Sequence, residues 1–154
     1  MADKEKTKKN NKDYVFAVGR RKEAVARVRL YTSVKDGLAW DELTVKKGDI
    51  LVNGQQIAEY FPSEIMRFVY TEPLRVANAQ NKYTFTIRVT GGGKAGQLDA
   101  VVAGLANALS KVDADSYRGL LKKKGLLERD SRIRQRRKVG MGGKSRRKRQ
   151  SPKR

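Results

Sequence analysis

Residues 83–109 read YTFTIRVTGGGKAGQLDAVVAGLANAL, and one regular pattern gives way to another across the three glycines. From residue 83 to residue 90, apolar and polar side chains alternate with a period of two, which predicts a half-buried β-strand. Beyond the glycines, apolar residues recur at helical spacing, with small residues between them that allow close approach to a neighbour. We therefore expect a strand, a turn and a helix whose apolar positions are Leu98, Val101, Val102, Leu105 and Leu109.

Two further strands are expected upstream, in residues 14–31. Tyr14, Phe16 and Val18 alternate on one side until Gly19 breaks the pattern. After the break, every second residue from position 24 to position 30 is apolar and faces one way. We expect the two strands to be joined at residues 19–22, with two arginines on the outward side of the second strand, Arg27 and Arg29.

The middle of the chain predicts a hairpin, a third strand and a helix. The turn sequences KDG (35–37) and KKGD (46–49) flank the hairpin, and the third strand ends at an Asn53-Gly54 turn signal. Ser63 is a candidate N-cap for the helix, whose expected apolar face holds Ile65, Met66 and Val69.

A last helix follows residue 113: Asp115 can cap it, and Gly125 can end it beyond an apolar face of Tyr117, Leu120 and Leu121. The sum is an α/β fold of the α+β sandwich type, with a small mixed sheet and about three helices on one face. This globular domain spans residues 13–128. A polar arm (1–12) precedes it and an extended basic tail (129–154) follows it, both too poor in apolar residues to fold alone.

The charge of the chain is concentrated in the tail. The 154 residues hold 36 Lys plus Arg and 16 Asp plus Glu, for a net charge of +20. Residues 131–154 carry 12 cations and no acid, which leaves +8 (20 − 12) for the rest. Such a charge points to a polyanionic partner such as nucleic acid. No stretch has the length of a membrane-spanning helix, and no signal peptide is evident, so we expect no membrane partner.

Many kinds of catalysis are excluded, because the chain has neither histidine nor cysteine. Histidine general bases, Cys/His dyads and Cys/His zinc sites cannot form. The lack of cysteine also fits a reducing compartment, and cytoplasm is the expected location. We expect no enzyme activity, no cofactor, no metal and no small-molecule substrate.

The glycine-rich segment at 91–96 matches the dinucleotide-binding pattern G-x-G-x-x-G, with acidic residues downstream. Its context differs, because residues 113–124 predict a helix where a second parallel strand is required. A P-loop is excluded because Gln97 and Leu98 replace its Lys and Ser or Thr. A flexible turn remains one interpretation. A site for one phosphate of a polynucleotide backbone at the helix N-terminus is the other, with Gly93, Lys94 and Gly96.

Two basic turns and one basic strand face are expected to form a single RNA-binding surface on the domain, to which the first turn adds Arg20, Arg21 and Lys22. The tail is interpreted either as a solubilising or targeting run or as a second RNA-binding element. Its mixture of arginine and glycine favours threading into a large RNA, mainly by phosphate neutralisation. The expected RNA-binding residues of the tail are Arg129, Arg132, Arg134, Arg136, Arg137, Lys138, Lys144, Arg146, Arg147, Lys148 and Arg149.

Four motifs resemble a known family. GRRKEAVARV (19–28), VNG with EYFP (52–62), GGGKAGQ (91–97) and RD…R…RRKVG (129–140) are similar to small-subunit ribosomal protein nine of bacterial type. The resemblance implies a structural protein of the small-subunit head that binds ribosomal RNA and neighbouring ribosomal proteins. It also implies a left-handed βαβ crossover, against the usual handedness, and a tail that reaches tRNA in the peptidyl site through Lys153 and Arg154.

Two segments depart from the family pattern. The chain ends Gln150-Ser151-Pro152-Lys153-Arg154, without the aromatic residue that the family has near the tip. Residues 32–48, with the only tryptophan, Trp40, resemble an inserted hairpin, which we expect to be peripheral. Two other functions remain open, a nucleotide-binding enzyme and a general nucleic-acid chaperone. Binding of free nucleotide would favour the first, and equal affinity for DNA and RNA the second.

Overall fold

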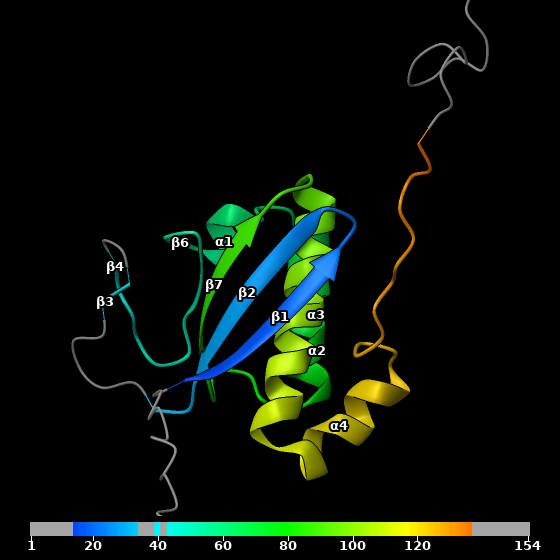
Figure 1. The fold of residues 1–154 in the computed structure, drawn as a ribbon. Helices are drawn as coiled ribbons and strands as arrows, with labels where there is room; N and C mark the ends of the chain where they lie inside the picture. Colours follow the sequence, from blue (N-terminus) through cyan, green and yellow to red (C-terminus); the bar gives the residue numbers. More distant parts are fainter. Residues whose placement is uncertain (1–13, 34–38, 41–42, 137–154) are drawn as a thin grey trace, which may run out of the picture.

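A five-stranded mixed sheet forms one layer of the fold, and the long helices cover one of its faces (Figure 1). The computed structural model describes residues 14–33, 39–40 and 43–136, so the expected arm and most of the tail lie outside it. The α+β class and the one-sided helix layer predicted from the sequence are both confirmed.

The strands of the main sheet follow the order β1-β2-β7-β5-β6. All neighbouring pairs are antiparallel except β5 and β7, which are parallel. A separate two-stranded ladder joins β3 to β4. The strands are β1 (Val15–Arg21), β2 (Ala24–Tyr31), β3 (Ala39–Trp40), β4 (Leu43–Thr44), β5 (Ile50–Val52), β6 (Gln55–Gln56) and β7 (Thr84–Thr90).

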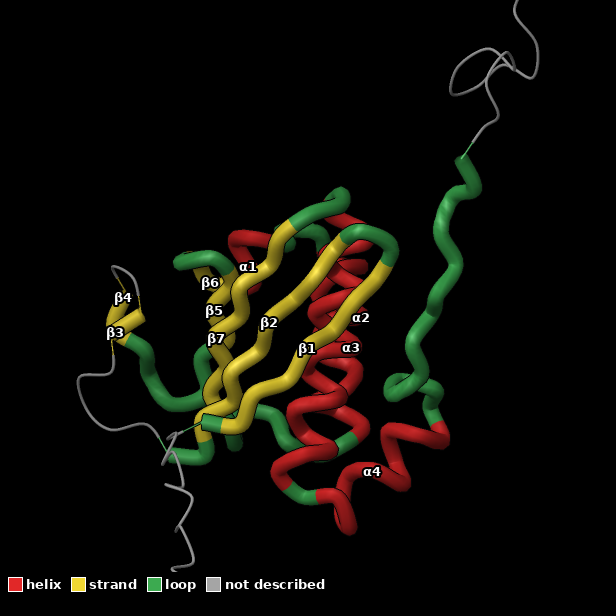
Figure 2. Tube along the Cα trace, viewed as in Figure 1, coloured by secondary structure: helices red, strands yellow, loops and turns green. Residues whose placement is uncertain are grey.

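Four helices are present in the described part of the chain, one more than expected. The added element is the short α1 (Ile57–Tyr60); the others are α2 (Glu64–Val76), α3 (Lys94–Val112) and α4 (Ala114–Lys123). Helix α3 lies against β1 and β2, and α2 packs beside it (Figure 2). None of the described helices is long and apolar enough to cross a membrane.

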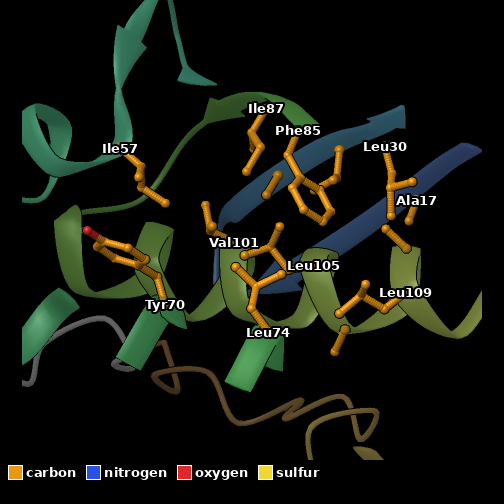
Figure 3. Close-up of a cluster of buried hydrophobic side chains, with 14 of the residues drawn as sticks. Ala17, Leu30, Ile57, Tyr70, Leu74, Phe85, Ile87, Val101, Leu105 and Leu109 are labelled. Carbon is orange, nitrogen blue, oxygen red and sulfur yellow. The ribbon is translucent and has the colours of Figure 1, made fainter. Parts of the chain in front are cut away.

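The hydrophobic core fills the space between the sheet and helices α2 and α3 (Figure 3). The predicted inward positions of β2 and β7 are all buried, as are most of the predicted apolar positions of α3. Burial of these side chains drives the two layers together. The labelled residues of the cluster are Ala17, Leu30, Ile57, Tyr70, Leu74, Phe85, Ile87, Val101, Leu105 and Leu109.

The first strand buries its small residues, on the side opposite the predicted set of Tyr14, Phe16 and Val18. Gly19 does not break β1 but lies within it, opposite Ala26, and the turn to β2 comprises only residues 22–23. Ala17 and Gly19 face the helices, whereas Phe16 lies on the outer face and is 45% exposed. The cause is the close approach of α3, because a Cβ on Gly19 would lie 1.9 Å from the Ala100 carbonyl oxygen. Only small residues fit there, so the bulky set faces outward.

Three smaller expectations about the helices are wrong. Ile65 is 76% exposed, because α2 turns Met66, Val69 and the buried Tyr70 toward the core instead. Helix α4 is capped by Asp113, whose carboxylate accepts a hydrogen bond from the Ser116 backbone N–H at 3.1 Å, rather than by residue 115. Leu120 is also exposed, although the other two predicted positions of α4 are buried.

The hairpin expected within residues 32–48 is present as β3 and β4. Residues 45–48, which follow β4 and belong to the same expected insertion, are not peripheral. Val45 is buried. The Thr84 hydroxyl donates to the Lys46 carbonyl at 3.3 Å and accepts from the Gly48 N–H at 3.0 Å. These contacts fasten residues 45–48 to the start of β7.

The parallel strands β5 and β7 are connected through α1 and α2 behind the sheet. In the view of Figure 1, β7 points upward and lies between β2 and β5. The chain leaves the upper end of β5, passes behind the sheet through the helices, and enters β7 on the side of β5 that faces β2. This crossover is left-handed, the rarer sense. It agrees with what the family resemblance implies.

Candidate nucleic-acid interface

The β1–β2 turn and the glycine loop lie side by side at one end of the sheet. Gly91 and Gly92 both have positive φ angles, and a Cβ on Gly91 would lie 2.4 Å from the Glu23 carbonyl oxygen. A Cβ on Gly92 would lie 3.1 Å from the Cβ of Ala24. These glycines are therefore required to pack the loop against the turn, which places the predicted cations of the two segments at the same end (Figure 1).

The N-terminus of α3 opens from this loop without a side-chain cap. Gly93 is the N-cap, and its carbonyl accepts the Gln97 N–H at 2.9 Å. A Cβ added to Gly93 would have nothing within 4 Å, in contrast to Gly91 and Gly92. The fold itself therefore does not require glycine at position 93. N–H groups of a first helical turn and the helix dipole attract anions, and the open space would allow one to approach the backbone.

The Lys94 side chain binds Tyr60 through its ammonium group. Its ammonium lies 3.4 Å from the ring centroid of Tyr60 and donates to the Tyr60 carbonyl oxygen at 3.3 Å. The same ring is fixed by its hydroxyl, which donates to the Gln97 side chain at 2.9 Å, and Gln97 donates to the Gly91 carbonyl at 3.1 Å. Lys94 thus adds charge beside the helix N-terminus from a fixed position. Sequence reasoning did not identify Tyr60, although it lies in the EYFP motif.

The outer face of β1, β2 and β7 is lined by arginines. Arg20, Arg27 and Arg29 are exposed, as predicted, and Arg27 lies in register with Arg88 of β7. The Arg29 guanidinium lies 5.0 Å from the ring centroid of Tyr14. Arg88 was placed on the outward side of its strand by the alternation, but it was not counted as a site residue. Together with the exposed Phe16, these residues form what we call the basic sheet face: Phe16, Arg20, Arg27, Arg29 and Arg88.

Arg21 lies on the opposite side of the strand from Arg20 and binds the start of the tail. Its Nη2 lies 3.1 Å from Asp130 Oδ2, its Nη1 donates to the Arg132 carbonyl at 2.9 Å, and its Nε lies 3.4 Å from Asp99 Oδ2. The Arg21 side chain is only 16% exposed. Its position joins β1, α3 and the tail, whereas the neighbouring expected RNA-binding cations point to solvent.

Asp130 is held by two arginines. The Arg132 guanidinium donates to both of its carboxylate oxygens at 2.7–3.0 Å, and the Arg132 backbone N–H donates to Oδ1 at 2.9 Å. These hydrogen bonds, with a smaller contribution from the Arg21 charge, hold the pKa of Asp130 far below its usual range. Asp130 therefore stays charged well below neutral pH, and its contacts link the base of the tail to Arg21 and Arg132.

The tail leaves the domain beside the β1 edge (Figure 2). A hollow of about 310 Å³ there is lined by charges of both signs, including Arg20, Asp99 and Arg132. Within the tail, the predicted residues Arg129, Arg132, Arg134 and Arg136 are exposed. The remaining predicted residues lie outside the described part of the chain: Arg137, Lys138, Lys144, Arg146, Arg147, Lys148, Arg149, Lys153 and Arg154.

The nucleotide-binding interpretation finds no support in the described residues. The chain after α3 continues into α4, so the glycine loop lacks the second parallel strand of a dinucleotide-binding unit. Among residues 14–33, 39–40 and 43–136, no cluster of three or more acidic side chains could hold a metal ion.

Comparisons with known proteins agree with these features. A family model described as "Ribosomal protein S9/S16" matches residues 19–154. The chain is 38% identical over 125 residues to "Small ribosomal subunit protein uS9" of Renibacterium salmoninarum, covering 81% of this chain and 67% of that protein. It is 38% identical over 133 residues to the protein of the same name from Maridesulfovibrio salexigens, covering 86% and 92%. The Leifsonia xyli protein is 39% identical over 125 residues, covering 81% and 67%.

Proposed function

The chain belongs to the ribosomal protein S9/S16 family, and from this premise we propose that it binds ribosomal RNA in the head of the small subunit. It is a structural, non-enzymatic component of the small ribosomal subunit. We assign ribosomal RNA contact to the basic sheet face, the β1–β2 turn, the glycine loop and the tail. The tip of the tail is assigned to tRNA in the peptidyl site, and the cytoplasmic ribosome is the proposed location.

The observation that carries this proposal is the convergence of separate cationic segments on one part of the domain. The close packing of Gly91 and Gly92 on the β1–β2 turn places Lys22 near the open N-terminus of α3. Arg20 extends the same region onto the outer sheet face. Such a surface follows a chain of phosphates better than it surrounds a free nucleotide, because it is broad and its charges are spread over three strands.

The junction at Arg21 gives the tail a defined origin at the end of β1, next to the β1–β2 turn. Because Arg21 binds both Asp130 and the Arg132 carbonyl, the tail begins from a fixed point beside β1. One RNA that lies on the domain surface can therefore also meet the first tail arginines. Further along, the cations can order on RNA as the particle assembles, with binding energy that offsets the entropy lost by the chain.

The proposal is tested by measuring the affinity for a small-subunit head RNA fragment by filter binding at 50 and 200 mM salt. Contact with at least about six phosphates should weaken binding by roughly 10³ or more over this range. A triple variant, Arg20→Ala, Arg27→Ala and Arg29→Ala, should bind more weakly. Its salt slope should be smaller by about 0.9 for each phosphate that the variant no longer neutralises.

The matched control removes the same number of charges from the end of α4, through Lys122→Ala, Lys123→Ala and Lys124→Ala, which are also exposed. Equally weakened binding in both triple variants would mean that net charge alone drives binding, as in a general nucleic-acid chaperone. Co-sedimentation of the full chain with small subunits after a high-salt wash gives an independent check of assembly. Failure to co-sediment would count against the proposal.

A further inference from the structure

The opposite end of the sheet from the basic turn carries a groove beside α2. β7 begins there, since Thr84 pairs with Tyr31 at this end and Thr90 pairs with Val25 at the other. The groove has a volume of about 460 Å³ and lies between α2, the loop at residues 79–81 and the starts of β5 and β7. Its lining includes four large apolar or aromatic residues, which we call its floor, Ile50, Leu74, Tyr83 and Phe85, and also the polar residues Thr71, Gln80 and Asn81.

Helix α2 presents two large apolar side chains to solvent next to this groove. Ile65 is 76% exposed and Phe68 is 66% exposed, and a spacing of three residues places them on the same side of the helix. Phe68 also lines the groove itself. Exposed apolar side chains that cluster beside a hollow are typical of surfaces that another molecule covers.

The charges near the groove differ from those of the RNA-binding region. Helix α2 carries Glu64, Arg67, Glu72 and Arg75 and is therefore neutral, in a chain with a net charge of +20. Among the residues that line the groove, two are charged, Arg67 and Arg75, and none is acidic. An RNA-binding surface would be expected to carry a broad excess of cations, whereas a protein interface combines an apolar centre with a few arginines.

We propose that this groove docks a segment of a neighbouring small-subunit protein, one with an apolar side chain beside one or more carboxylates. The apolar side chain enters between Phe68 and the floor of the groove, and the carboxylates pair with Arg67 and Arg75. This inference rests on the proposed function, since it assumes a place in the assembled particle. It divides the domain into an RNA-facing end and a protein-facing end.

A crosslinking experiment can test the proposal, because the chain has no native cysteine. Single-cysteine variants Phe68→Cys, Lys22→Cys and Leu120→Cys are labelled with a thiol-reactive benzophenone and incorporated into small subunits. The particles are then irradiated, and the crosslinked products are identified by mass spectrometry. Leu120 is the matched control, because it is an exposed apolar residue on a different helix, α4.

Residue 68 should crosslink to a ribosomal protein at a segment that contains carboxylates. Residue 22 should crosslink to ribosomal RNA. Residue 120 should not give the product that is seen at residue 68. Adding Arg67→Glu and Arg75→Glu to the Phe68→Cys variant should lower the yield of that product by about tenfold, since like charges would face each other. Crosslinks from residue 68 to RNA, to a segment without carboxylates or to nothing would overturn the inference while leaving RNA binding intact. Absence of all three variants from the particles would instead contradict the proposed function.

Discussion

The Nη2 atom of Arg21 lies 3.1 Å from Oδ2 of Asp130, which joins the end of the first strand to the base of the tail. The same guanidinium donates to the Arg132 carbonyl, and its Nε faces Asp99 of α3. The prediction that Arg21 binds RNA stays a prediction, and its contacts add a role in positioning the tail. Arg27 of β2 is exposed on the outer side of the sheet and is not part of this junction, so RNA binding and tail positioning can be separated by mutation.

Replacing Arg21 with alanine should free the base of the tail while leaving the domain folded. The reason is that the Arg21 side chain links β1 to residues 130–132, whereas the core lies elsewhere. Limited trypsin digestion should cleave after Arg129 and Arg132 several-fold faster than in the wild-type chain, with little change in the thermal midpoint. The control Arg27→Ala, an exposed residue of β2, should digest at the wild-type rate and bind RNA more weakly. Equal digestion of Arg21→Ala and wild type would show that the Arg21 side chain does not restrain the tail.

The pH dependence of this junction should be flat around neutrality. The pKa of Asp130 is lowered in the folded state. The stability that the Asp130 carboxylate adds to the junction is therefore fully present above the ordinary pKa of about 3.9, and it is lost as the pH falls through the lower folded-state pKa. Hydrogen exchange, corrected for its intrinsic pH dependence, should show constant protection of the Arg132 amide from pH 5 to 8. Asp130→Ala should remove that protection throughout the range, because no side-chain acceptor for the Arg132 N–H remains. A loss of protection in the wild type between pH 6 and 5 would contradict the assignment.

Alternation predicted the core-facing sides of β2 and β7 correctly, but Thr84 and Thr86, on the other side of β7, are buried as well, which the alternation did not predict. In β1 the alternation did not decide which side is buried. Its buried side holds Ala17 and Gly19, while the exposed side holds Phe16, so hydrophobicity pointed the wrong way. What decides the orientation is the closeness of α3, a property of two distant segments that no local window contains.

The candidate site was predicted only in part, because local patterns place side chains on a face but do not identify partners that are distant in the sequence. Strand alternation placed Arg27, Arg29 and Arg88 on one face without any knowledge of their partners. The roles of Arg21 and Lys94 could not be predicted, because each depends on a residue far away in the sequence, Asp130 and Tyr60 respectively. Composition identifies how many cations are available, and only the fold shows which of them already have a partner.

Gly19→Ala should destabilise the domain strongly. The new methyl group would lie 1.9 Å from the Ala100 oxygen and 2.4 Å from the Gly104 nitrogen, and both are backbone atoms that cannot move without shifting α3. We expect a loss of about 3 kcal/mol or more in the free energy of unfolding, at the upper end for overpacked sites. Urea denaturation provides the measurement.

Gly119→Ala is the matched control, since it adds the same methyl group within α4 with nothing inside 4 Å. It should increase stability by roughly 0.5 to 1 kcal/mol, because alanine is favoured over glycine in a helix. If both variants unfolded at the same urea concentration, the close approach of β1 and α3 would not be a determinant of stability.

Gly93→Ala separates folding from RNA binding. A methyl group at this position meets no atom within 4 Å and the φ angle is −114°, so the thermal midpoint should stay near the wild-type value. If a phosphate approaches the backbone at the start of α3, the methyl group should hinder it and weaken RNA binding by about 1 kcal/mol, the value of one hydrogen bond. Gly119→Ala serves as the comparison, because it also adds a methyl group with nothing within 4 Å, but on α4 and outside the proposed phosphate site. Unchanged affinity in Gly93→Ala would remove the loop from the RNA-binding surface.

The final prediction concerns the tip of the tail, which lies outside the described residues. From Arg136, the last residue described, 18 residues (154 − 136) lead to the C-terminus and can span up to about 60 Å when extended. Arginine is dense up to residue 149, whereas Lys153 and Arg154 stand beyond Pro152. We therefore expect the inner part to serve assembly on ribosomal RNA and the two terminal cations to contact tRNA phosphates, which carry no sequence information.

Deleting residues 152–154 should leave subunit assembly unchanged and weaken tRNA binding in the peptidyl site by roughly 1 to 3 kcal/mol, the range for charged hydrogen bonds. The effect should be similar for different tRNAs, because backbone phosphate is the proposed binding group. Deleting residues 129–154 should impair both assembly and tRNA binding. Filter binding of several tRNAs to programmed subunits, with gradient profiles of the particles, distinguishes these outcomes. Wild-type tRNA affinity after the three-residue deletion would show that the terminal cations do not contribute to tRNA retention.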